Sequence, residues 1–128
     1  MTRYAIDAPV ALELIRHGSG RSLPAGDSLV GPAVLRSDVL VLLYALPDDT
    51  GRALLDELAA LRLRLLGDRV SRAVAWRIAR ELGWSDPRPA EYLAVAQLQA
   101  DVLVTADPQL LAGAHAAAIP TAEPSALE

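Results

Sequence analysis

The stretch "DVLVTADP", residues 101–108, decides the fold, because it leads a buried strand directly into a helix. Its "VLV" run is apolar without interruption, which is typical of a strand covered on both faces of a parallel sheet. Asp107 and Pro108 are residue types that open a helix. The N-terminus repeats the pattern, with "RYAI" at residues 3–6 followed by Asp7 and a second helix. Strand–helix units at both ends of the chain predict a parallel sheet.

The predicted architecture is an α/β/α domain of three layers around a parallel sheet of about four or five short strands, since crossover helices cover both faces. We expect one domain over residues 1–122, a loose C-terminal tail over 123–128, and a loop over 18–28. The other expected elements are strands at 29–30 and 118–121 and helices at 9–16, 34–46, 50–66, 69–82, 88–99 and 108–116.

The composition excludes several classes of protein. A formal net charge of −4 over 128 residues argues against a general nucleic-acid coat protein, which needs many phosphate contacts. All 12 basic residues are arginines, so a P-loop enzyme or a phosphoacceptor receiver domain would lack its lysine. No apolar run is long enough to span a membrane, and the absence of cysteine fits a reducing cytoplasm.

Two aspartates follow the two strands that are expected to be central. Asp7 comes after residues 3–6, and Asp107 comes after residues 101–106. Because parallel strands end at the same edge of a sheet, both side chains are expected there, where open α/β sheets build their sites. Each aspartate also stands at the start of a helix, where aspartate is a preferred cap. Capping and site chemistry are both open interpretations for these residues.

A third aspartate, Asp38, stands inside the apolar stretch "VLRSDVLVLLYAL", residues 34–46. The helix predicted there is apolar on almost every side, so we expect it to be buried nearly all round. A buried carboxylate needs a partner, which is either an arginine or another hydrogen-bond donor, or a metal ion shared with Asp7 and Asp107. Oxygen ligands without cysteine favour a hard cation, Mg²⁺ or Mn²⁺.

The sequence resembles the PIN-domain proteins, and in particular the VapC-type toxins of bacterial toxin–antitoxin pairs. The resemblance rests on "YAIDAPVAL", "VGPAVLRSDVLVLL" and "WSDPRPAEYLAVAQLQADVLVTADPQL", in this order along nearly the whole chain. It implies a Mg²⁺- or Mn²⁺-dependent endoribonuclease with RNA as substrate, an antitoxin protein as partner, and a homodimer. Of the family's four acidic positions, Asp7 matches the first, Asp38 the second, where glutamate is more usual, and Asp107 the last.

The chain departs from the family at the third acidic position, where Pro89 replaces the usual aspartate. On a helix with 3.6 residues per turn, Asp86 lies within about 60° of this position and Glu91 about 160° away. We therefore expect Asp86 to be the substitute metal ligand, beside Asp7, Asp38 and Asp107, and Glu91 to point elsewhere. The alternative is an impaired or inactive PIN-like domain that binds protein or RNA without cleaving it.

Several other residues have both a functional and a structural interpretation. Arg69, Arg72 and Arg80 share one face of the helix predicted at 69–82, either as a phosphate-binding stripe or as a solvated face. Thr105 and Ser37 are candidates for orienting a carboxylate or a phosphate, or are ordinary strand and helix residues. Trp76 and Trp84 are expected to fill the core or an interface.

Overall fold

The computed structural model describes residues 1–18 and 23–127; residues 19–22, part of the predicted loop, and residue 128 lie outside the described residues. Its centre is one parallel sheet of five strands in the order β3-β2-β1-β4-β5, which confirms the predicted fold class. The strands are β1 (Arg3–Ile6), β2 (Ser28–Pro32), β3 (Arg64–Leu66), β4 (Val102–Val104) and β5 (Thr121–Ala122). The helices are α1 (Ala8–His17), α2 (Leu35–Tyr44), α3 (Asp48–Ala60), α4 (Arg69–Glu81), α5 (Ala90–Gln99) and α6 (Pro108–Ala116).

The strand order creates a topological switch point beside β1. The chain moves from β1 outward through β2 to β3, and then returns to the other side of β1 to form β4 and β5. The register pairs Ile6 of β1 with Val104 of β4. In open α/β sheets such a switch point leaves a crevice outside the carboxyl ends of the two strands. The residues that directly follow Ile6 and Val104 therefore line the predicted location of a site.

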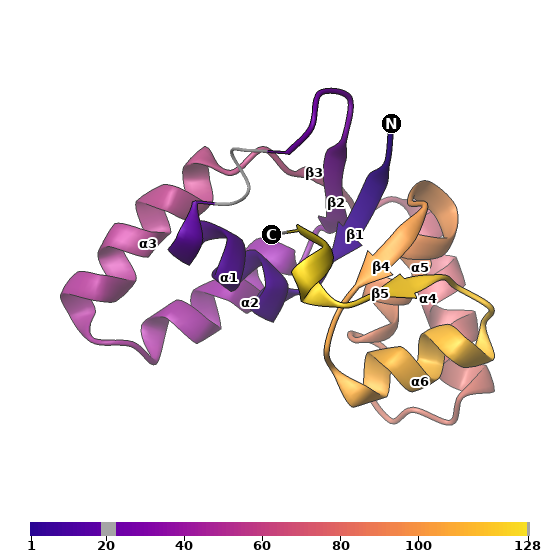
Figure 1. The fold of residues 1–128 in the computed structure, drawn as a ribbon. Helices are drawn as coiled ribbons and strands as arrows, with labels where there is room; N and C mark the ends of the chain where they lie inside the picture. Colours follow the sequence, from indigo (N-terminus) through magenta and orange to yellow (C-terminus); the bar gives the residue numbers. More distant parts are fainter. Residues whose placement is uncertain (19–22, 128) are drawn as a thin grey trace.

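The helices form two groups around the sheet. Figure 1 shows α1, α2 and α3 gathered to one side of the strands, and α4, α5 and α6 to the other. Helix α5 lies against β1, β2 and β4, and both α4 and α6 pack on it. Because α5 is covered on several sides, its residues 92–96 are all buried. This helix connects the sheet to α4 and carries the segment around Pro89 to the edge of the crevice.

The strand β3 corrects the predicted helix over residues 50–66. The helix α3 ends at Ala60, and residues Arg64–Leu66 form the edge strand instead. Val30 of β2 pairs with Arg64, and the backbone of Ala33 donates to the carbonyl of Leu66. The leucine-rich segment is compatible with a helix by its local pattern, but pairing with β2 provides ladder hydrogen bonds that a longer helix would forgo.

The helix α2 is not buried nearly all round, as its apolar sequence had predicted. Only Leu35, Val39 and Leu43 are buried, and they are the residues that the 3.6-residue period places on one face. Leu40, Val41 and Tyr44 are exposed large apolar side chains on the opposite side. Only one face of the helix is therefore buried, and Leu40, Val41 and Tyr44 form an apolar part of its exposed surface.

The C-terminal segment differs from the loose tail that was predicted. Pro124–Leu127 form a short 3-10 helix, and Leu127 is buried against the core. The burial of one leucine side chain contributes about 1.5–3 kcal/mol, which is enough to hold a short segment in place.

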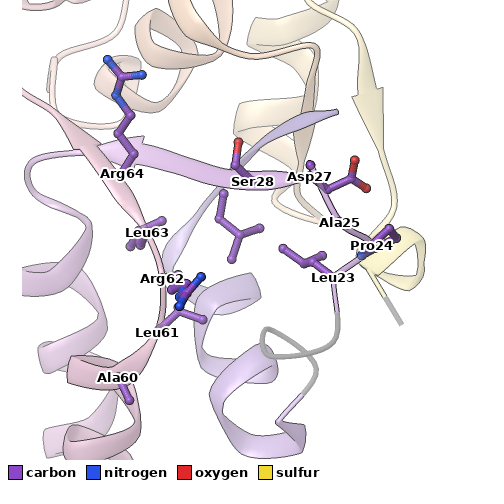
Figure 2. Close-up of a pocket in the computed structure, with 12 residues that line it drawn as sticks. Leu23, Pro24, Ala25, Asp27, Ser28, Ala60, Leu61, Arg62, Leu63 and Arg64 are labelled. Carbon is purple, nitrogen blue, oxygen red and sulfur yellow. The ribbon is translucent and has the colours of Figure 1, made fainter. Parts of the chain in front are cut away.

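A pocket of about 770 Å³ lies at the opposite end of the sheet from the crevice. It is bordered by the loop before β2 and by the chain that enters β3, and Figure 2 shows Arg64 pointing away from Leu23 and Leu61. Its acidic residue, Asp27, already accepts a hydrogen bond from the backbone of Thr2. This pocket brings no acidic cluster together. Across residues 1–18 and 23–127, none of the helices has the length and apolar character needed to cross a membrane.

Candidate active site

Asp7 stands at the carboxyl end of β1, where the register of the sheet predicted a crevice. Its side chain is 3% exposed, and its Oδ1 accepts a hydrogen bond from the backbone N–H of Val10, 3.1 Å away. This bond is that of a helix cap, because Asp7 precedes α1. The capping interpretation is thus confirmed, and it uses one of the two carboxylate oxygens. The other oxygen faces β4.

Thr105 joins Asp7 to the segment that follows β4. Its hydroxyl donates to Oδ2 of Asp7 at 2.5 Å and accepts from the backbone N–H of Asp107 at 3.0 Å. The two residues meet because each follows one member of the Ile6–Val104 pair. Thr105 therefore orients a carboxylate, as one of its two sequence interpretations predicted.

Asp107 caps α6 on the same edge of the sheet. Its Oδ1 accepts from the backbone N–H groups of Gln109 at 2.8 Å and Leu110 at 3.4 Å. The residue is exposed, unlike Asp7. Both aspartates are helix caps, and both lie at the carboxyl ends of neighbouring strands, so the two interpretations left open by the sequence are compatible.

The pKa of Asp7 is raised above its ordinary value. The largest cause is burial, which disfavours the charged carboxylate, and the negative charge of Asp107 acts in the same direction. The hydrogen bonds from Thr105 and Val10 oppose the rise, since they stabilise the ionised form. The donors of Asp7 are thus neutral groups in a buried environment. A nearby cation would stabilise the ionised carboxylate relative to the protonated one.

Asp38, on the first turn of α2, has charged and polar partners from the other end of the chain. The guanidinium of Arg88 donates to its Oδ1, and the hydroxyl of Tyr92 donates to its Oδ2 at 2.6 Å. The side chain of Asp38 remains 22% exposed. Of the partners that the sequence left open, the structure supplies an arginine and a hydroxyl donor.

Tyr92 lies between the two acidic positions. Its pKa is raised above the ordinary value of a phenol, first by burial, then by its hydrogen bond to Asp38, and also by the charges of Asp38 and Asp7. A phenol in this environment stays protonated and donates to Asp38 across the physiological pH range. Tyr92 belongs to α5, so this helix carries the donor that links the Asp7 and Asp38 parts of the site.

Around Pro89 the structure separates Asp86 from Glu91. Asp86 is exposed, and its Oδ1 accepts from the backbone N–H of Arg88 at 3.0 Å, so it closes a local turn. Glu91 instead lies near Asp38: burial raises its pKa most, the charges of Arg88 and Arg72 lower it, and that of Asp38 raises it.

The helical phase predicted Glu91 to point elsewhere, and this stays a prediction, although the charges of Asp38 and Arg88 act on the pKa of Glu91. Helix α5 begins at Ala90, and Pro89 before it already has helical backbone angles, with φ −60° and ψ −29°. A glutamate side chain is also long enough to approach residues that do not lie on its own side of the helix. In the sequence, Glu91 could be noticed only because it is an acidic residue two positions after Pro89.

The acidic residues suit a hard cation by their chemistry, since all their donors are oxygen atoms. Within the described ranges, however, no three acidic or histidine side chains are placed to hold one metal ion together. At Asp38 both carboxylate oxygens accept hydrogen bonds within the protein, from Arg88 and from Tyr92. The predicted ligands Asp7, Asp38, Asp107 and Asp86 remain a prediction.

A ridge on α4, formed by Arg72, Trp76 and Arg80, begins beside this site. The residues are spaced four apart and therefore lie along one side of the helix. Trp76 is 60% exposed, so of its two expected places, the core or an interface, the core is excluded. The guanidinium of Arg80 lies 4.8 Å from the centre of its ring. Arg72 influences the pKa of Glu91, so the α4 ridge reaches the acidic residues at one end.

Comparisons with known proteins support the fold. No family model matches the sequence, and no curated protein matches it significantly. PAE2754 from Pyrobaculum aerophilum is 22% identical with a TM-score of 0.74, and the match covers 98% of this chain and 92% of that one. VapBC2 from Rickettsia felis, bound to a DNA fragment from their promoter, is 10% identical with a TM-score of 0.69, over 94% and 98% of the two chains.

A third structure, VapBC-1 from nontypeable Haemophilus influenzae, is 14% identical with a TM-score of 0.63, and the match covers 96% of this chain and 98% of that one. The three matches extend over nearly the full length of both chains in each case. Because the sequence identities are low, these matches show similarity of the fold alone. The chain therefore has the PIN-like fold that its sequence resemblance predicted.

Proposed function

We propose that this protein is a metal-dependent endoribonuclease of the VapC type, with Mg²⁺ or Mn²⁺ held by Asp7, Asp38 and Asp107. The observation that carries the proposal is Asp7, a carboxylate buried at the switch point of the sheet whose pKa burial and Asp107 raise. Its ionised form is unfavourable there without a cation, and a divalent ion would remove the repulsion between the two aspartates.

The residues around the acidic positions have distinct roles in this proposal. Asp7, Asp38 and Asp107 would hold a divalent ion, which would supply an activated water and would offset charge on the phosphate. Thr105 fixes the orientation of Asp7, and Tyr92 holds one oxygen of Asp38. The α4 ridge offers two guanidinium groups for phosphates and one indole ring for a base, which is the combination that single-stranded nucleic acid prefers.

The proposed partner is a small antitoxin protein, and the cytoplasm is the proposed location. Two of the three similar structures are VapBC complexes, which supports a partner of that kind. The exposed apolar side chains of α2, Leu40, Val41 and Tyr44, offer a surface for such a partner or for a second copy of the chain. Covering them would remove an apolar patch from water.

A second candidate function is a PIN-like module that binds without cleaving. Two observations favour it: Pro89 stands at the third acidic position, and Arg88 already neutralises Asp38. In this case the site would need no metal, because its second carboxylate has an internal counter-ion. The nuclease should bind divalent ions and cleave RNA, whereas the binding module should do neither.

Cleavage of a single-stranded RNA library of random sequence tests the proposal, with Mn²⁺, Mg²⁺ or EDTA present. We expect cleavage with either ion, none with EDTA, and a loss of about 100-fold or more for Asp7→Asn. Asp56→Asn on the exposed side of α3 is the matched control and should cleave like the wild type. Cleavage that persists in EDTA, or in Asp7→Asn, would contradict the proposal; absence of both cleavage and ion binding favours the binding module.

A further inference from the structure

We propose that Arg88 is a positioning residue that takes the place of a cation at the acidic site and competes with the divalent ion for Asp38. This inference rests on the proposed function, because it concerns the same site. In the structure the guanidinium of Arg88 forms an ion pair with Asp38. Binding of a divalent ion to Asp38 and the ion pair between Arg88 and Asp38 are then two alternatives, and the balance between them sets the affinity for the ion.

The position of Arg88 supports this role. Its guanidinium donates to Oδ1 of Asp38, and its charge also lowers the pKa of Glu91, so it serves two carboxylates at once. Without Arg88, the like charges of Asp38 and Glu91 would act on each other, as the rise that Asp38 causes in the pKa of Glu91 shows. Two neighbouring carboxylates without a counter-ion are the environment that attracts a divalent cation.

The local backbone holds Arg88 in place while leaving its side chain able to move. The carboxylate of Asp86 accepts from the backbone N–H of Arg88, so the turn before α5 is fixed. The side chain of Arg88 is itself 49% exposed, so its guanidinium can exchange Asp38 for water at little cost. The hydroxyl of Tyr92 can keep its bond during this exchange, since it uses the other oxygen of Asp38.

Glu91 is the residue that gains a new role when Arg88 leaves. It is partly buried beside Asp38, and Pro89 leaves the third acidic position of the resemblance without a carboxylate. Released from the charge of Arg88, Glu91 is the nearest acidic side chain that α5 can offer. The substitution at residue 89 and the arginine at residue 88 are thus two parts of one arrangement, in which the ion must displace an arginine.

Calorimetric titration with Mn²⁺ tests the competition, with Arg88→Gln as the main variant. We expect Arg88→Gln to bind Mn²⁺ about tenfold more tightly than the wild type, since removing a neighbouring positive charge favours a cation by an amount comparable to a shift of one pKa unit or more. Arg88→Lys keeps the charge and should stay close to the wild type. Arg77→Gln, an exposed arginine of α4 paired with Glu81, is the matched control and should change nothing.

A second pair of variants separates competition from a general structural effect. In the Asp38→Asn background, Arg88→Gln should no longer tighten Mn²⁺ binding, because the carboxylate under competition is absent. In thermal melts without metal, Arg88→Gln should lower the Tm, and saturating Mn²⁺ should raise the Tm of this variant more than that of the wild type. If Arg88 had only a structural role, Arg88→Gln would lower the Tm without metal, but saturating Mn²⁺ would raise the Tm of the variant and of the wild type equally.

The outcomes distinguish this inference from the proposed function. If the wild type binds Mn²⁺ and cleaves RNA, but Arg88→Gln binds the ion equally or more weakly, the competition is overturned and the nuclease proposal stands. If neither the wild type nor Arg88→Gln binds Mn²⁺ at millimolar concentration, both proposals fail. Tighter binding by Arg88→Gln together with unchanged binding by Arg88→Lys and Arg77→Gln supports the competition.

Discussion

The two ends of the acidic site hold the same kind of charge in different ways. At the β1–β4 end, Asp7 is buried, and its hydrogen-bond donors among the described residues are the neutral groups of Val10 and Thr105. At the α2–α5 end, Asp38 is partly exposed and has a guanidinium and a phenol. The comparison teaches that burial without a charged partner makes the charge of Asp7 unfavourable, whereas an arginine compensates the charge of Asp38. We therefore expect a cation to stabilise ionised Asp7 more than ionised Asp38.

The clearest test of this difference removes one hydroxyl at the buried end. Thr105→Val keeps the shape of the side chain but leaves Oδ2 of Asp7 without its donor. We expect the free energy of unfolding to fall by about 1–3 kcal/mol at neutral pH, since a buried charged acceptor is then unsatisfied. Urea denaturation measures the change. An effect below that of the matching variant at the other end, Tyr92→Phe, would break the comparison.

Substitution of the two carboxylates should have opposite effects on the metal-free protein. Asp7→Asn removes a charge that burial disfavours and should raise the Tm. Asp38→Asn removes the partner of Arg88 and should lower the free energy of unfolding by about 0.5–1 kcal/mol, as expected of a half-exposed ion pair. Thermal melts in EDTA at pH 7 provide the measurement, and changes of the same sign in both variants would contradict the distinction.

Tyr92→Phe removes the matching hydroxyl at the α2–α5 end. We expect a loss of about 0.5–1.5 kcal/mol, because Asp38 keeps its bond to Arg88 and water can approach the free oxygen. The same urea experiment as for Thr105→Val gives the value. A larger loss than at Thr105 would mean that the phenol, rather than the arginine, chiefly stabilises Asp38.

The smallest effect concerns the pH dependence of the Asp7 end. Because the folded protein has a raised Asp7 pKa, this residue contributes stability that is fully present below its ordinary pKa of 3.8 and is lost as the pH rises through the raised value. The advantage of Asp7→Asn over the wild type should therefore shrink as the pH falls from 7 toward 4. Thermal melts of both proteins at several pH values measure this difference in Tm. A difference that increases as the pH falls would contradict the prediction.

The sequence was sufficient to predict the sheet and the strand-end aspartates, but not the edge strand or the exposed faces. The strand β3 was missed because Arg64–Leu66 continue a leucine-rich helical pattern, and only the neighbouring β2 supplies partners for its backbone. The exposure of Leu40 and Val41 on α2 was missed for a related reason. Apolar composition alone does not say which side of a helix finds a neighbour.

The sequence by itself determined the contacts between residues that lie only a few positions apart. Asp7 caps α1 through Val10, and Asp107 caps α6 through Gln109, because a helix start fixes the geometry of its own cap.

Only the tertiary structure decided how the carboxylates are compensated. The bonds from Thr105 to Asp7, from Arg88 to Asp38 and from Tyr92 to Asp38 span 98, 50 and 54 residues. Such pairs depend on where α5 and β4 are placed against β1 and α2. No local period carries that information, since it arises only when strands and helices pack into one core.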